Sequence, residues 1–143
     1  MGAAAAAIRF VHAAISSLSP FSVAAVAMVS CCEALLAAPL PILETARLSL
    51  RPFVASDAAA VQANLGDGRI AETTLTIPHP YPLGAAEEFI SRHPDAWREG
   101  KSATWAMTER TTGRLVGAMS LRLTLAHHRA EAGYWVAVDE WGK

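Results

Sequence analysis

Charged side chains are scarce at the start of this chain, and cysteine is scarce throughout. Residues 1–43 carry only Arg9 and Glu33 as charged groups. The two cysteines, Cys31 and Cys32, are adjacent, a spacing that gives neither a disulfide framework nor a zinc site. The net charge is −1 over 143 residues, so the chain lacks the basic field of a nucleic-acid-binding protein. With 52% hydrophobic residues, it is also too apolar to be disordered as a whole.

The composition divides the chain into two parts. Residues 44–143 hold eleven basic and twelve acidic side chains, which is a normal charge load for a globular surface. The seam lies at residues 38–41, with the sequence APLP. We therefore expect an apolar N-terminal extension over residues 1–41 and one domain over residues 42–143.

Residues 10–32 form an uncharged stretch of 23 residues that contains six polar side chains and Pro20. As a helix it would reach about 35 Å, which is enough to cross a bilayer. The stretch also has the length of a secretory signal, although its cleavage site is poor. The third reading is an extension without a targeting role. We expect a cytoplasmic protein without a membrane partner, and export or anchoring through residues 10–32 is the alternative.

The first half of the domain alternates between strand and helix patterns. Residues 46–53 place Leu48 and Leu50 on one face, which predicts a half-buried strand ended by Pro52. Ser56 and Asp57 then predict the cap of a helix that ends near Leu65. The proline-rich residues 78–82 predict an extended segment or turn. A second helix is expected from about residue 84, with Pro94 kinking it or starting a new turn.

The last third of the chain predicts strands only. Residues 102–110 and 115–125 alternate on either side of a tight connection, which is typical of a hairpin. Residues 126–129 predict another turn, and residues 130–138 a further strand with Tyr134, Val136 and Val138 on one face. Adjacent His127 and His128 in a turn point apart and have no third ligand, so no metal site is expected. The order of elements predicts an α/β domain with an antiparallel meander.

Four segments of the domain together resemble the GNAT acetyltransferases. They are LETARLSLRP at residues 43–52, PHPYP at 78–82, TGRLVG at 112–117, and EAGYWV at 131–136 followed by WGK at 141–143. The resemblance is nearest to the ribosomal-protein N-acetyltransferases of the RimJ/RimL type and covers about residues 42–143. It implies an α/β, partial GNAT (acyl-CoA N-acyltransferase) fold, with a mixed, largely antiparallel sheet and two N-terminal helices.

The resemblance also implies a reaction and a set of site residues. The reaction is transfer of an acetyl group from acetyl-CoA to a primary amine, which is either a protein N-terminus or a small molecule. The backbones of Trp135, Val136 and Ala137 would line the pantetheine arm. Glu131 would act as the catalytic base, since an ammonium must lose a proton before it can attack. The first three positions of the pyrophosphate loop would be Trp141, Gly142 and Lys143.

The resemblance ends before the family's pattern does. The loop glycines that follow in the family, and the strands behind them, have no counterpart in these 143 residues. The sequence is therefore interpreted as the N-terminal portion of a C-terminally truncated domain. The alternative function is a catalytically inactive fragment that acts at most as a binding module. An open sheet edge in such a fragment predicts self-association. For Glu131, the alternative is a solvated residue at a strand end, beside Arg129.

Overall fold

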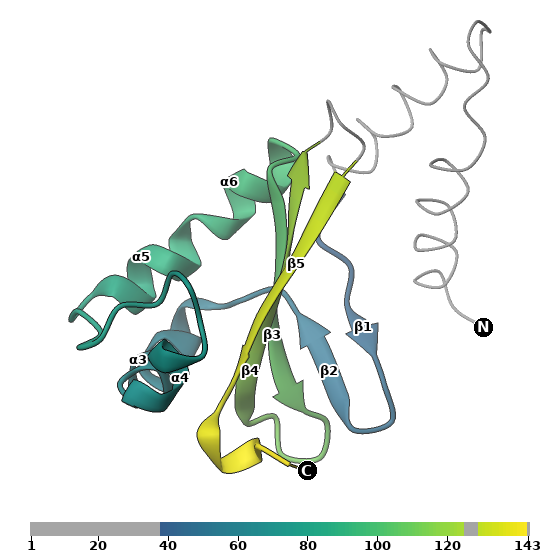
Figure 1. The fold of residues 1–143 in the computed structure, drawn as a ribbon. Coiled ribbons are helices and arrows are strands. Elements are labelled where there is room, and N and C mark those ends of the chain that lie inside the picture. The colour runs from purple at the N-terminus through teal and green to yellow at the C-terminus, as the bar shows by residue number, and fades with distance from the viewer. Residues whose placement is uncertain (1–37, 125–128, 143) are drawn as a thin grey trace, which may run out of the picture.

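The computed structural model describes residues 38–124 and 129–142 as a five-stranded sheet with helices on one side (Figure 1). The expected extension over residues 1–41 and the apolar stretch at 10–32 lie almost entirely outside these residues. Within the described part, no helix is long and apolar enough to span a membrane.

The sheet is antiparallel throughout, with the strand order β1-β2-β3-β4-β5. Its strands are β1 (Leu43–Glu44), β2 (Leu48–Arg51), β3 (Ser102–Glu109), β4 (Leu115–Thr124) and β5 (Arg129–Val136). The predicted fold class is confirmed, and the sheet contains no parallel pair among the described strands. A register shift between Met107 and Thr108 marks a β-bulge in the β3–β4 pair.

Four short helices connect β2 to β3, where one helix ending near Leu65 and a second from about residue 84 were expected. A 3-10 turn η1 (Ala55–Asp57) leads into α3 (Ala58–Leu65), and α4 (Gly68–Glu72), α5 (Ala85–Ser91) and α6 (His93–Arg98) follow. Asp67 accepts a hydrogen bond from the Arg69 amide and so starts α4 directly after α3. Pro94 lies in the first turn of α6, so it starts a new helix.

Two apolar clusters cover the two faces of the sheet. The helix-side cluster joins Val61 and Leu65 of α3 and Ile90 of α5 to Trp135 of β5. The opposite cluster is built on Trp105 and Met107 of β3, with residues near the N-terminal end of the domain packed against it. Because both faces are covered, residues 103–108 of β3 are all buried, so neither side of this alternating strand faces solvent.

The indole groups of two tryptophans fix the segment before β1. Trp105 Nε1 donates to the Pro41 carbonyl at 2.8 Å, and Trp97 Nε1 donates to the Ala38 carbonyl at the same distance. These contacts hold residues 38–41 near the cluster on the far face of the sheet.

Two local predictions were wrong in detail. The strand expected over residues 130–138 ends at Val136, and Val138 belongs to the 3-10 turn η3 (Val138–Glu140). The Asp57 carboxylate does not cap α3. Instead it accepts hydrogen bonds from the Val54 amide and from the guanidinium of Arg51, and η1 precedes the helix.

Candidate active site at the outer edge of β5

The outer edge of β5 carries backbone groups that do not pair with β4. The Ala137 amide donates to the Val116 carbonyl at 2.8 Å, and the Gly133 carbonyl accepts the Ser120 hydroxyl at 3.3 Å. The backbone N–H and C=O groups of residues 133, 135 and 137 therefore point toward β4. Because successive residues of an extended strand turn their amides to opposite edges, those of Tyr134 and Val136 face outward. Among the described strands, none pairs with this edge.

Trp141 folds back onto the same edge. Its indole Nε1 donates to the Val136 carbonyl at 3.0 Å, while the 3-10 turn η3 is closed by the bonds from the Glu140 amide to the Ala137 carbonyl and from the Trp141 amide to the Val138 carbonyl. The indole is 45% exposed. The chain next passes through Gly142, whose φ of 80° lies in the left-handed region that favours glycine. These hydrogen bonds fix the backbone conformation of the turn after β5.

A salt bridge ties this turn to the β3–β4 connection. Arg114 Nη2 lies 2.6 Å from a Glu140 carboxylate oxygen and 3.9 Å from one of Glu109. The hydrogen bond to Glu140 raises the pKa of Arg114. Solvent screens an exposed pair of this kind, so the contact orients η3 more than it stabilises the fold. In Figure 1 the turn η3, drawn in yellow after β5, lies beside the β3–β4 connection.

Gly117 of β4 pairs with Val136 of β5 and lets the two strands approach closely. A Cβ added at Gly117 would lie 2.3 Å from the Trp135 carbonyl oxygen and 2.6 Å from the Met107 methyl group. No side chain fits in that space. Close packing of β4 against β5 therefore requires glycine at position 117, the last residue of the TGRLVG segment. Gly113 of the same segment lies in the β3–β4 connection and has a φ of 72°, a left-handed conformation that favours glycine.

Glu131 lies further along β5 and is exposed. Its Cα pairs with that of Arg122 on β4. Because side chains alternate along a strand, Glu131 is on the same face of the sheet as Trp135, with Gly133 between them on that face. The buried Trp135 packs into the helix-side cluster, and its indole nitrogen has no hydrogen-bond partner in the structure. Tyr134 projects to the other face and is 72% exposed.

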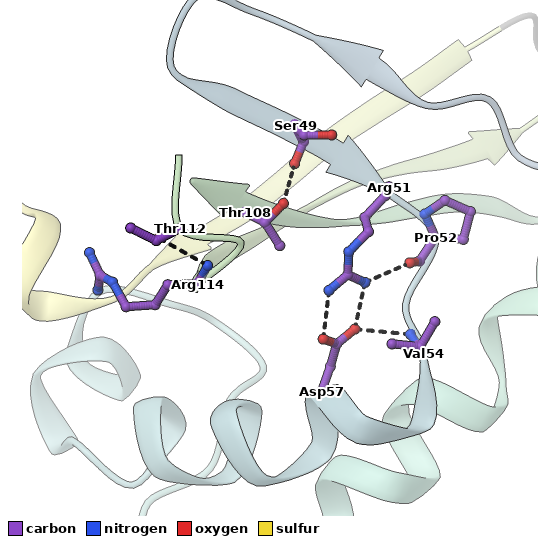
Figure 2. A network of polar contacts seen from close by, with 8 residues as sticks. All are labelled: Ser49, Arg51, Pro52, Val54, Asp57, Thr108, Thr112 and Arg114. Carbon is purple, nitrogen blue, oxygen red and sulfur yellow. Dashed lines mark hydrogen bonds and ion pairs between the residues drawn. The ribbon is translucent and has the colours of Figure 1, made fainter. Parts of the chain in front are cut away.

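An arginine fork anchors the start of the helical layer to the sheet (Figure 2). Arg51 makes two 2.8 Å hydrogen bonds to the carboxylate of Asp57 and a third bond to the Pro52 carbonyl. Burial raises the pKa of Asp57, but the bonds from Arg51 and the Val54 amide outweigh it and leave this pKa below its ordinary value. The fork fixes the angle at which the chain leaves β2. This network explains the RP pair in the LETARLSLRP segment.

A model of the acetyltransferase (GNAT) domain family matches residues 47–143. The chain belongs to the GNAT acetyltransferase family. Among curated proteins, it is similar to the uncharacterized N-acetyltransferase YoaA of Bacillus subtilis (strain 168), with 28% identity over 102 residues. That alignment covers 71% of this chain and 57% of YoaA, so the chain spans little more than half the length of this relative.

Solved structures share the fold at low sequence identity. RimL, a ribosomal L7/L12 α-N-protein acetyltransferase in complex with coenzyme A, gives a TM-score of 0.62 at 15% identity, over 72% of this chain and 59% of RimL. The microcin C7 self-immunity acetyltransferase MccE, in complex with acetyl-CoA and AMP, gives 0.59 at 15% identity, over 69% and 56%. At such identities the likeness establishes the GNAT fold and not the substrate.

The structure brings most of the predicted site residues to one strand and the turn behind it. Trp141 contacts Val136 at the outer edge of β5 and Gly142 follows Trp141 in the chain, whereas Glu131 is nearer the other end of the strand. Lys143 lies outside the described residues. Sequence reasoning missed Tyr134 as a bearer of an outward amide and missed the Arg114–Glu140 pair. The described residues contain no cluster of three or more His, Cys, Asp or Glu side chains that would hold a metal ion.

Proposed function

We propose that this chain binds acetyl-CoA along the outer edge of β5 and transfers its acetyl group to a primary amine, on a protein N-terminus or a small molecule. The observation that carries the proposal is the outward Val136 amide beside the turn closed by Trp141. The pantetheine arm contains amide groups, and an amide-bearing chain can add to an open strand edge through main-chain hydrogen bonds. The solved structures of MccE in complex with acetyl-CoA and of RimL in complex with coenzyme A support the choice of ligand.

Of the three backbones expected to hold the cofactor, we assign the Val136 amide as the donor. The Ala137 amide already donates to the Val116 carbonyl. Because amides alternate in direction along a strand, the Trp135 amide also points toward β4. Tyr134 supplies the next outward amide and carbonyl. The Val136 carbonyl already accepts a hydrogen bond from the Trp141 indole. An amide N–H of the pantetheine arm would therefore donate to the Tyr134 carbonyl instead. In this proposal Trp141, Gly142 and Lys143 are the first three positions of the loop that binds the pyrophosphate.

The reaction we propose is direct transfer. The amine nitrogen attacks the thioester carbonyl carbon, a C–N bond forms, and the tetrahedral intermediate collapses with cleavage of the C–S bond. An outward amide that donates to the carbonyl oxygen would stabilise the negative charge developing on it. The leaving thiolate takes up a proton, and the attacking amine gives up one. Glu131 is proposed to receive the amine's proton, through water where the amine is out of direct reach.

Calorimetry with acetyl-CoA tests the binding part of the proposal. Val136→Pro removes the outward N–H donor, and a proline is tolerated on an edge strand whose N–H faces solvent. The matched control is Ala132→Pro, which removes an outward amide further from the turn. We expect at least tenfold weaker binding for Val136→Pro and binding near that of the unmodified chain for Ala132→Pro. Equal affinities in both variants would contradict the assignment, provided that thermal unfolding shows both to be folded.

Turnover separates the enzyme from the binding module that the sequence left open as an alternative. We expect the chain to release free thiol from acetyl-CoA in the presence of amine acceptors. Glu131→Gln should then lower kcat at neutral pH, where the amine acceptor is protonated and needs a base, with little change in the KM for acetyl-CoA. Glu87→Gln, an exposed carboxylate on α5, is the control. Binding without turnover would favour the non-catalytic alternative, and absence of binding would overturn both.

A further inference from the structure

His93 lies at the point where three elements of the helical layer meet. It is the first residue of α6, and Arg92 before it ends α5 and begins α6. The imidazole packs edge to face with Phe89 of α5, with ring centroids 4.4 Å apart, and against Phe53 from the link after β2, at 5.5 Å. The two phenylalanines also contact each other, at 5.6 Å. The three rings therefore form one aromatic cluster, which joins the β2–η1 link to the α5–α6 junction.

The polar end of the imidazole has no partner in this cluster. Nε2 of His93 is buried and makes no hydrogen bond. As a neutral imidazole with its proton on Nδ1, the ring leaves only one weak acceptor, Nε2, unsatisfied. Protonation would convert the same atom into a buried, charged N–H donor without an acceptor, which is far more costly.

The charged groups on the packed elements do not offset that cost. Arg92 lowers the pKa of His93 in addition to the larger effect of burial, which together bring it to about 4. Three carboxylates on these elements are each paired with an arginine: Asp57 with Arg51, Glu88 with Arg92, and Asp95 with Arg98. Glu87, the other carboxylate of α5, is exposed and does not contribute to the pKa shift of His93. Attraction of an imidazolium to the phenylalanine rings offsets only part of the cost of burying a cation without a hydrogen-bond acceptor.

We propose that His93 is an acid-sensitive latch: when its imidazole takes up a proton, the ring leaves Phe53 and Phe89, and the α5–α6 junction opens while the sheet stays folded. The inference is independent of the proposed acetyl transfer. Opening would act on the helical layer that packs over α3, since Phe53 and Phe89 border the helix-side cluster.

Hydrogen exchange of backbone amides in the 143-residue chain tests the latch. A group that titrates at 6.5 when exposed and at about 4 when packed favours the open form about thirtyfold more at pH 5 than at pH 8. After correction for intrinsic exchange rates, we expect a rise of ten- to thirtyfold in the open population of α5 and α6. Amides in the centre of β3 and β4 should show a much smaller change.

Three variants make the result decisive. His93→Phe keeps an aromatic ring and removes the titration, and His93→Gln does the same with a polar side chain if the first variant folds poorly. His79→Gln changes the other histidine of the described residues, which is exposed. We expect the acid-dependent opening to persist in His79→Gln and to disappear in both His93 variants. An unchanged opening in the His93 variants, or an equal rise in the sheet, would overturn the latch.

Discussion

Replacing Gly117 with alanine should destabilise the fold at the place where the candidate site is built. The new methyl group would lie 2.3 Å from the Trp135 carbonyl oxygen and 3.2 Å from the Val136 Cα, both of which are backbone atoms of β5. The Met107 methyl at 2.6 Å belongs to a flexible side chain and can move aside. The β5 backbone cannot move without lengthening its hydrogen bonds to β4.

The magnitude follows from two opposing effects. Overpacking of a buried site costs about 1–3 kcal/mol, and contact with backbone on one side puts Gly117→Ala in the upper half of that range. Alanine in place of glycine in a strand returns about 0.5–1 kcal/mol through the unfolded chain. We therefore expect a net loss of about 1–2.5 kcal/mol, which corresponds to a fall in Tm of roughly 5–15 °C for a domain of this size.

Gly133→Ala is the matched control, because it lies on β5 in the same strand pair. The nearest atom to its added Cβ is the Ser120 hydroxyl oxygen at 3.3 Å, at the end of a side chain that can rotate. Urea unfolding followed by far-UV circular dichroism should show Gly133→Ala to be as stable as the unmodified chain or up to about 1 kcal/mol more stable. Equal stabilities for the two variants would refute the claim that β4 and β5 meet too closely at Gly117 for a side chain.

Two further predictions concern the polar contacts that hold the site. Asp57→Asn should lower the free energy of unfolding by about 2–4 kcal/mol in urea titrations, because it leaves the half-buried Arg51 without its charge partner. Since the pKa of Asp57 is lowered by folding, its contribution is present above the unfolded carboxyl pKa and is lost as the pH falls through the folded value. Trp141→Phe keeps the ring but loses the bond to the Val136 carbonyl, so acetyl-CoA affinity measured by calorimetry should fall two- to tenfold. An affinity that is unchanged or higher would show that the indole does not orient the turn.

The pattern of the sequence predicted the strands better than the helices. Leu48 and Leu50, and the alternating residues after Ser102, marked β2, β3 and β4 to within a few positions, because side-chain alternation is visible in the chain itself. The short helices α4 and α6 were missed or left open because five or six residues give too little periodicity to recognise. β1 has only two residues and depends on pairing with β2.

The site was predicted by resemblance, and its geometry required the structure. Alternation along β5 can be read from the sequence, but not which set of amides pairs with β4. That choice is made by contacts across the sheet, such as the Ala137 amide on the Val116 carbonyl. The same holds for His93, whose aromatic partners come from residues 53 and 89. The predicted self-association through the open edge stays a prediction.

The most direct test of the central claim is a nuclear magnetic resonance titration of the ¹⁵N-labelled 143-residue chain with acetyl-CoA. The account predicts that the largest amide shifts fall on Val136 and Tyr134, with the Trp141 indole N–H shifting as the neighbouring turn responds. Amides of β5 that face β4, such as that of Ala137, should move less. Shifts confined to other elements, or no shift at millimolar acetyl-CoA, would contradict the placement of the acetyl-CoA site at the outer edge of β5.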